Sequence, residues 1–444
     1  MDQRVNKLDQ VLAADLSLDH VVFDQLRAAQ RELGLVFGDR PTCPFLRPYI
    51  LNRRQYDDVK DAAETVAHAF EKVAHKALID KKLMSLLSPT PIEEEMARMD
   101  PGYARLCVTS RLDSYITTHG FHFLEYNAEN PAGVGDQMQL ENLLFTLAPL
   151  RSFLASHRHW LPQPHRILLE SLLQAYREWG GEVERPQIAI VDWHGVPTGS
   201  EFRVLRDYFV ACGYPAVIAD PHDLHYNGDT LSVDGFRIDI VYKRVVIHEF
   251  LTKFPREHPL TNAYKDRRVF MANSFRSKLV HKKAGFAVLS DESYDYLFTP
   301  EEREVIRRHI PWTRVVKEST TVFRGAEWDL LSLIRAHGRE FVLKPNDDYG
   351  GRGVFVGWEL SAEEWEAAIR TALGRPYVVQ ERVAAEKISM PAYSDRVSLE
   401  EVYVDFNPFL FHNKVEGALI RLSSSAMLNV TSGGGQTALL VLEE

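Results

Sequence analysis

Residues 341–358, FVLKPNDDYGGRGVFVGW, contain two short apolar runs on either side of a glycine-rich turn. The runs at 341–343 and 354–357 are typical of β-strands, so the segment predicts a hairpin. Few side chains cover its tip, where backbone N–H groups can close over an anion. Lys344 ends the first strand and can reach the same anion as a point charge. A polyphosphate fits best, bound by Lys344, Gly350, Gly351, Arg352 and Gly353.

A plain glycine-rich hairpin with a surface lysine explains the same residues equally well. The segment is not a Walker P-loop, because no Gly-Lys-Ser/Thr follows the glycines. Downstream, a helical pattern at 362–373 precedes a buried-type strand at 377–383. A lysine strand, a glycine hairpin, a helix and an apolar strand in this order resemble the nucleotide-binding half of the ATP-grasp fold. The resemblance implies bound ATP, with adenine read by Gln380, Glu381, Arg382 and Val383 and the ribose contacted by Glu386.

A second informative stretch is 105–130, RLCVTSRLDSYITTHGFHFLEYNAEN. It predicts two strands joined by a turn near His119. Arg111 and Asp113 share one face of the first strand, Glu125 and Asn127 share one face of the second, and Asp113 pairs close to Glu125. Two carboxylates and an amide suit Mg²⁺, which substrate phosphates complete. The alternative is a surface hairpin with a salt bridge from Arg111 to either carboxylate.

Arg-x-Asp, a hairpin and Glu-x-Asn ahead of the lysine and glycine elements resemble the circularly permuted ATP-grasp ligases. These include the glutathionylspermidine synthetase and eukaryotic glutathione synthetase groups, in which the metal-binding strands come first. The resemblance implies an α/β (α+β) ATP-grasp fold in circularly permuted order, with an α/β pre-ATP-grasp domain. It also implies that Asp113, Glu125 and Asn127 hold Mg²⁺ and that Arg111 stabilises a phosphate or acyl phosphate.

Two further segments carry candidate residues. In the turn 130–136, NPAGVGD, the backbone amides around Asn130 and Gly133 can hold a substrate carboxylate, although a plain cap of the helix predicted at 138–150 is equally plausible. Residues 273–289 predict a helix with a basic face. The family has a second ATP-contacting lysine at this point, and the match favours Lys283 over its rivals Lys278 and Lys282. A solvated basic helix face is the alternative.

Near the C-terminus, strand patterns at 403–411 and 418–422 precede a glycine loop, NVTSGGGQ at 429–436. This region resembles the Arg…Asn-x-Ser/Thr-x-Gly-Gly-Gly pattern of one branch of permuted ATP-grasp proteins. The resemblance implies that Arg421, Asn429, Gly433 and Gly434 line the active site, whereas the alternative is a flexible terminus. Asp348 lies four residues after Lys344, where some relatives have a metal-binding glutamate, and its role stays open.

Composition limits the class of protein. The 444 residues predict two or three packed units, and the 45% hydrophobic and 26% charged content is typical of a soluble globular protein. A net charge of −10 argues against a broad nucleic-acid-binding surface. Three scattered cysteines fit a reducing compartment, and neither a signal peptide nor a bilayer-spanning run is found. We expect a cytoplasmic protein with no nucleic-acid or membrane partner.

Five regions are expected along the chain. The helical pattern at 57–87 predicts that residues 1–100 form a scaffold or a substrate-side cap. Patterns at 187–192, 201–212 and 216–219 predict a strand–helix–strand unit with parallel strands, followed by a hairpin from 225–231 and 236–242. The other regions are the metal-binding part of the core at 101–182, an α/β substrate domain at 183–270, a nucleotide-binding lid at 271–384, and C-terminal core strands at 385–444.

Together these features predict an ATP- and Mg²⁺-dependent carboxylate–amine ligase that forms an acyl phosphate and releases ADP. No nucleophilic residue is required, because phosphoryl transfer depends on positioning and charge neutralisation. The alternatives are a kinase-like phosphotransferase and a catalytically inactive ATP-binding regulatory or scaffold protein. The sequence names neither the acid nor the amine substrate, and it leaves the oligomeric state open.

Overall fold

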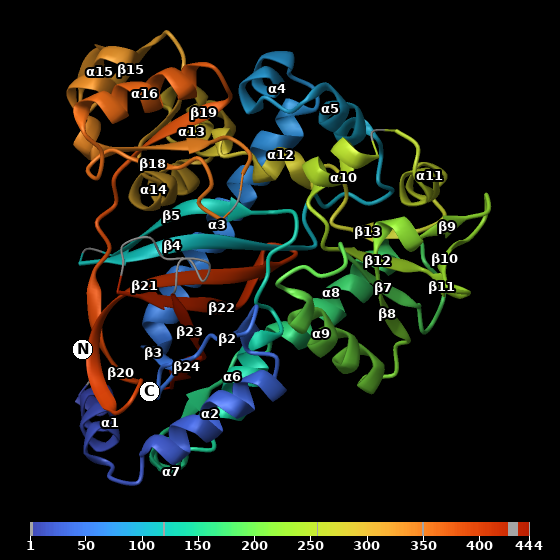
Figure 1. Ribbon diagram of the computed structural model, residues 1–444. Coiled ribbons are helices and arrows are strands. Elements are labelled where there is room, and N and C mark those ends of the chain that lie inside the picture. Colours follow the sequence, from blue (N-terminus) through green and yellow to red (C-terminus); the bar gives the residue numbers. More distant parts are fainter. Residues whose placement is uncertain (1–2, 119, 255, 349, 425–433, 444) are drawn as a thin grey trace.

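The computed structural model describes residues 3–118, 120–254, 256–348, 350–424 and 434–443. A six-stranded antiparallel sheet lies at the centre of the mixed α/β molecule (Figure 1). Its strands follow the order β23–β22–β21–β4–β5, and β20 pairs with part of β21. Their bounds are β4 (Thr109–Thr117), β5 (Gly120–Asn127), β20 (Lys387–Tyr393), β21 (Val397–Phe411), β22 (Lys414–Ser423) and β23 (Gly435–Thr437).

A smaller four-stranded sheet lies above the central sheet in Figure 1 and contains the glycine hairpin. Its order is β14–β19–β17–β18, with every pair antiparallel. The strands are β14 (Thr313–Val315), β17 (Phe341–Pro345), β18 (Phe355–Val356) and β19 (Tyr377–Glu381). The hairpin that the sequence predicts is formed by β17 and β18. Helix α16 (Ala362–Leu373) has the predicted bounds, because Ser361 and Glu364 form a capping box at its start.

The third unit is a parallel sheet of order β13–β12–β7–β8, on the opposite side of the molecule from β20 (Figure 1). The predicted strand–helix–strand unit is confirmed by β7 (Ile188–Val191), α9 (Gly199–Ala211) and β8 (Ala216–Ala219). The predicted hairpin is shorter than expected: β10 (Leu231–Val233) pairs with β11 (Phe236–Ile238) and with β9 (His225–Tyr226). Its last residues form β12 (Ile240–Lys243), which is buried throughout and pairs in parallel with β7 and with β13 (Phe270–Ala272).

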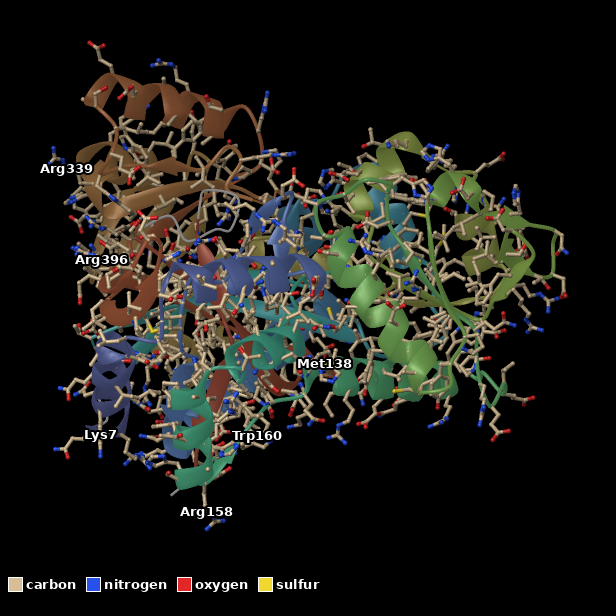
Figure 2. All side chains as sticks on the ribbon, turned by 60° about the horizontal axis from the view of Figure 1, so that its bottom comes forward. Lys7, Met138, Arg158, Trp160, Arg339 and Arg396 are labelled. Carbon is tan, nitrogen blue, oxygen red and sulfur yellow. The ribbon has the colours of Figure 1, made fainter. Side chains whose placement is uncertain are left out.

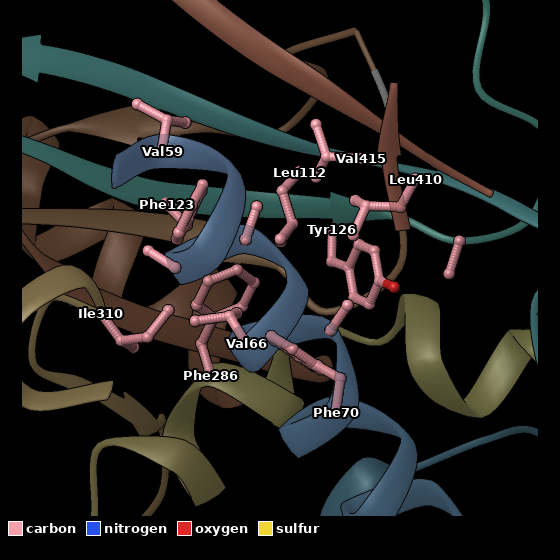
Figure 3. Packing of buried hydrophobic residues seen from close by; sticks show 14 of the residues in the cluster. Val59, Val66, Phe70, Leu112, Phe123, Tyr126, Phe286, Ile310, Leu410 and Val415 are labelled. Atoms are coloured by element: carbon pink, nitrogen blue, oxygen red, sulfur yellow. The ribbon is translucent and has the colours of Figure 1, made fainter. Parts of the chain in front are cut away.

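The N-terminal hundred residues are mostly helical, as predicted: α1 (Gln3–Ala14), α2 (His20–Glu32), α3 (Arg53–Ala77), α4 (Lys81–Leu87) and α5 (Pro91–Arg98). The pattern at 57–87 is two helices, because Asp80 accepts bonds from the backbone of Lys82 and Leu83 and begins α4. Helix α3 passes along the central sheet and buries an apolar stripe against it (Figure 3). Exposed charged side chains such as Lys7, Arg158 and Arg339 project from the outside of the molecule (Figure 2).

Phe70 of α3 packs against both the central sheet and the segment that precedes β14 of the small sheet. Its ring centroid lies 4.9 Å from that of Tyr126 on β5 and 4.9 Å from that of Phe286 (Figure 3). We expect Phe70→Ala to lower the free energy of unfolding by about 3–5 kcal/mol, because a large buried ring leaves a cavity that collapses only partly. Urea denaturation measures the loss. The control Val210→Ala removes a half-exposed side chain from α9 and should change it by about 0.5 kcal/mol or less.

Two predicted helices are interrupted. Residues 273–289 form α12 (Ser277–His281) and α13 (Ala284–Leu289). The alternative of a solvated basic face is wrong, because Lys278, Lys282 and Lys283 are buried beside carboxylates. Residues 138–150 divide between α6 (Asp136–Leu144) and α7 (Ala148–Ser156), where a proline occupies the first turn of α7.

Candidate functional site

A cavity of about 260 Å³ lies between the β4–β5 hairpin and the β17–β18 hairpin. Asp113 and Glu125 line it from the central sheet. Lys344, Gly350 and Gly351 line it from the small sheet, and residues 380–385 form a further wall. The structure therefore brings the acidic hairpin, the glycine turn and the segment after β19 to one shared cavity.

Four charged side chains form a row on the cavity face of the central sheet. The strand register places Asp113 on β4 opposite Glu125 on β5. It also places Asp405 on β21 opposite both Tyr115 on β4 and Arg421 on β22. Tyr115 is two residues from Asp113, so both point to the same face of β4. Each of four neighbouring strands thus contributes one charged side chain to the row. These three carboxylates and one guanidinium all line the cavity.

Asp113 is held firmly within this row. Its Oδ1 accepts from Arg111 Nε at 2.7 Å and from Asn127 Nδ2 at 3.0 Å. Its Oδ2 accepts from Arg111 Nη2 at 3.0 Å and from Arg421 Nη2 at 2.7 Å. Burial alone would raise the pKa of Asp113, but the guanidinium groups of Arg111 and Arg421 hold it below its usual range. The salt bridge from Arg111 to Asp113 does form, and it is buried rather than on the surface.

Two lysines face Glu125 and the glycine turn. Lys283 Nζ lies 2.8 Å from Glu125 Oε1 and donates to the carbonyl of Asp348 at 2.7 Å. Lys344 Nζ donates to Gln380 Oε1 at 2.7 Å and to the carbonyl of Leu124 at 3.2 Å. Burial lowers the pKa of Lys344 to about 8, although nearby Glu125 acts in the opposite direction. Lys344 lines the cavity, whereas Lys283 does not belong to its wall and is linked to it through the contact with Glu125.

The other two lysines of this segment serve a buried ionic cluster outside the cavity. Lys278 Nζ lies 2.7 Å from Glu129 and 2.6 Å from Asp347. Lys282 Nζ lies 2.8 Å from Glu93 and 2.5 Å from Asp347. Asp347 belongs to the segment that leads from β17 into the glycine turn. These lysines therefore anchor the base of that turn, and Lys283 is the one of the three that contacts a cavity residue.

The glycine turn requires its glycines for backbone reasons. Gly350, Gly351 and Gly353 have φ angles of +67°, +76° and +67°, in the left-handed region that favours glycine. Gly353 lies against the small sheet, where the Tyr377 hydroxyl donates to its carbonyl at 3.0 Å. Gly350 and Gly351 line the cavity, whereas Gly353 and Arg352 do not belong to its wall.

Several other predicted site residues have structural partners instead. The backbone N–H groups of Gly133 and Val134 donate to Glu201 Oε1, both at 2.9 Å, so an internal carboxylate occupies the place expected for a substrate. The Asn130 side chain donates to the carbonyl of Arg244. Arg40 donates to the carbonyl of Gly434 at 3.1 Å. In the first loop these contacts are structural, and in the second Gly434 is held by Arg40.

Glu386 is exposed and absent from the cavity wall, where residues 380–385 end. Its backbone N–H donates to the carbonyl of Ile116, so the chain at this point returns to β4 of the central sheet. Arg111 and Asn127 hydrogen-bond Asp113 and do not belong to the wall. The predicted residues Asn429 and Gly433 fall outside the described residues.

Asp405, Tyr403 and Trp358 are among the cavity residues that were not predicted from the sequence. Trp358 carries the Arg382 guanidinium 4.2 Å from its ring centroid, so the end of the glycine hairpin contacts the segment after β19. Tyr403 and Asp405 are two residues apart on β21 and share the cavity face. Because Tyr403 and Asp405 are two residues apart in the predicted strand 403–411, the sequence could have shown that both side chains lie on one face. Burial raises the pKa of Asp405 to about 7 against the influence of Arg421.

The donor set fits a hard divalent cation and a polyphosphate. Carboxylate oxygens from Asp113, Glu125 and Asp405 line the cavity, and oxygen ligands are those that Mg²⁺ prefers. Lys344 and Arg421 supply positive charge for phosphate oxygens. Asp113 already accepts four hydrogen bonds, about the full capacity of a carboxylate, so a cation would have to displace one of them.

No protein-family model matches this chain, and no curated protein matches it significantly. Several solved structures are similar to this chain. The glutathione synthetase-like effector from Globodera pallida, in its apo form, is 14% identical, with 94% of this chain and 96% of that chain covered and a TM-score of 0.57. A putative gamma-glutamylcysteine synthetase from Methylobacillus flagellatus is 8% identical, with 86% and 85% covered and a TM-score of 0.43. A RimK domain ATP-grasp protein from Sphaerobacter thermophilus is 15% identical, with 57% and 90% covered and a TM-score of 0.28.

The first of these similarities extends over nearly the whole of both chains and shows a shared fold. The fold is the mixed α/β ATP-grasp class that the order of lysine strand, glycine hairpin, helix and apolar strand indicates. The other two similarities are too weak to add to this. Among the described residues, the helices are too short or too polar to cross a membrane.

Proposed function

We propose that this protein is an ATP- and Mg²⁺-dependent carboxylate–amine ligase. ATP transfers its γ-phosphate to a substrate carboxylate, and an amine then attacks the acyl phosphate to give an amide, ADP and phosphate. The observation that carries the proposal is the shared cavity: Lys344 and two turn glycines face Asp113, Glu125 and Arg421 across it. A purely structural glycine hairpin has no need of charged residues from four strands of another sheet on its open side.

The geometry suggests an orientation for ATP. Residues 380–385 offer the backbone edge that follows β19, and apolar side chains such as Val342 and Val356 flank it, which suits adenine. The phosphates then extend toward Lys344 and Lys283 on one side and the charged row on the other. Arg421 stands at the far end of the row from Glu125, where it would neutralise charge on the transferred phosphoryl group.

The glycine turn acts as a cover in this proposal. Its backbone N–H groups close over the phosphates, and Lys344 at its base is positioned by Gln380. A closed cover excludes water, which protects an acyl phosphate from hydrolysis until the amine arrives. Asp113 keeps Arg111 and Arg421 in place, and with Glu125 and Asn127 it provides oxygen ligands for Mg²⁺. The bound cation would neutralise phosphate charge during transfer.

The regions of the chain take corresponding roles in the proposal. Residues 101–182 and 385–444 supply the core sheet, residues 271–384 form the nucleotide-binding lid, and residues 183–270 form a substrate domain. Because the acidic hairpin precedes the lysine strand in the chain, the order of elements is that of the circularly permuted ligases. The helices of residues 1–100 support the core.

The experiment that tests the proposal is a coupled ADP-release screen over amino acids, small peptides and polyamines, with mass detection of the amide. We expect ADP release that requires both an acid and an amine, together with a product whose mass corresponds to their condensation. ADP release with a phosphorylated acid and no amine requirement would favour the kinase-like alternative. ATP binding without any turnover across the screen would favour a binding or scaffold protein.

The lowered pKa of Lys344 gives the proposal a pH dependence. With a pKa of about 8 in the empty cavity, this lysine is half neutral near pH 8, whereas bound phosphates favour its ammonium form. ATP binding should therefore take up a proton near pH 8, and the affinity should fall up to about tenfold per pH unit above it. Calorimetry in two buffers of different ionisation enthalpy measures the uptake. An affinity that stays constant from pH 7 to 9.5 would contradict this role.

A further inference from the structure

The two carboxyl oxygens of Asp405 have different surroundings. Oδ2 accepts a hydrogen bond from Arg421 Nη2. Oδ1 is buried and has no hydrogen-bond partner among the described residues, although the side chain is only 2% exposed and lines the cavity. An unpartnered buried carboxylate oxygen is costly, so the position calls for a ligand that the protein itself does not supply.

Arg421 has a complementary unpartnered group. Its Nε is buried with no acceptor among the described residues, while its Nη2 bridges Asp113 and Asp405. This end of the row therefore presents one open acceptor beside one open donor. A cation paired with an anionic oxygen satisfies both groups together, and a divalent cation bound to a phosphate is such a pair.

Of the three ligands that the sequence resemblance supplies, Asp113 is the most fully engaged by hydrogen bonds. Asp113 already accepts four hydrogen bonds, and Asn127 uses its amide nitrogen to hold Asp113. Glu125 contacts Lys283 through Oε1. Asp405 lies two strands from Glu125 on the same face, across β4.

We propose that Asp405 is an oxygen ligand, through Oδ1, of the divalent cation that accompanies ATP, while Oδ2 stays bound to Arg421. This inference rests on the proposed function and adds a residue that the family resemblance does not assign. It also gives Arg421 a second role. Its guanidinium faces the phosphate and, at the same time, positions the Asp405 carboxylate that binds the cation.

The test measures cation binding directly, without turnover. Mn²⁺ is titrated into the full-length protein with a non-hydrolysable ATP analogue, and free Mn²⁺ is followed by electron paramagnetic resonance. We expect Asp405→Asn to weaken Mn²⁺ binding about tenfold or more. The matched control, Asp239→Asn, removes a buried carboxylate from the parallel-sheet unit and should leave Mn²⁺ binding unchanged. Analogue binding in the presence of a chelator should be similar in both variants.

A result in which Asp405→Asn keeps wild-type Mn²⁺ affinity but weakens metal-free analogue binding would overturn the inference, since Asp405 would then only position Arg421. A wild-type protein that does not bind the analogue at all would instead refute the proposed function. If Asp405→Asn fails to fold, anomalous scattering from Mn²⁺ in wild-type crystals decides the question. The ion is expected in direct contact with Asp405, and an ion coordinated without this residue contradicts the proposal.

Discussion

Asp113→Asn is expected to lower the rate of ADP release by roughly 100- to 1000-fold, the range found when one preorganised charge-stabilising group is lost. Asp113 carries the charge that fixes Arg111 and Arg421, and it lies opposite Glu125 at the end of the cavity where we propose that the phosphates bind. Asparagine has the same shape but no charge, so Arg111 loses the carboxylate with which it pairs and Arg421 keeps only its ion pair with Asp405. ATP binding should weaken only modestly, because Lys344 and residues 380–385 are unchanged.

Steady-state ADP release and equilibrium binding of ATP, measured on the same preparation, separate these two effects. Asp220→Asn serves as a matched control, since Asp220 is a buried carboxylate in the parallel-sheet unit with hydrogen bonds of its own. Turnover of Asp113→Asn at the wild-type rate would refute the catalytic assignment of the acidic hairpin.

Lys344→Met is expected to have the second large effect, a loss of ATP affinity of about 100-fold, or about 2.7 kcal/mol. Methionine retains most of the length of the side chain but removes the charge that a phosphate would meet. Gln380 Oε1 and the Leu124 carbonyl also lose the donor they share. Isothermal titration with ATP measures the change.

Lys265→Met is the control for this variant, because Lys265 is an exposed lysine of α11 (Pro259–Lys265), remote in the chain from the glycine turn. Its affinity for ATP should equal that of the wild type. If Lys344→Met binds ATP normally, the glycine hairpin is not a phosphate-binding element and the alternative of a plain hairpin holds.

Local patterns predicted the elements that form the cavity. The apolar runs around the glycine turn gave β17 and β18, and the alternation of Asp113 with Arg111 and of Glu125 with Asn127 gave the face that the β4–β5 hairpin presents. Both are hairpins between neighbouring segments, so their pairing is decided by residues that lie close together in the sequence.

The role of Asp405 depends on contacts that local patterns do not encode. Asp405 belongs to the row only because β21 lies between β4 and β22 in the sheet. The pairing of β21 with β4 joins segments that are almost 300 residues apart in the sequence. The same holds for Lys278 and Lys282, whose partners Glu93, Glu129 and Asp347 come from three separate regions. A basic helix pattern is typical of a solvated face. Here the lysines are buried instead, because carboxylates from distant parts of the chain pair with them.

In the proposed mechanism, one nucleotide contacts the glycine turn and the acidic hairpin at the same time. Hydrogen-exchange mass spectrometry with and without a non-hydrolysable ATP analogue and Mg²⁺ tests this claim most directly. We predict slower exchange in residues 350–358, in residues 380–386 and in the 111–127 hairpin together, with little change in the parallel-sheet unit. Protection confined to other parts of the chain, or to one hairpin without the other, would contradict it.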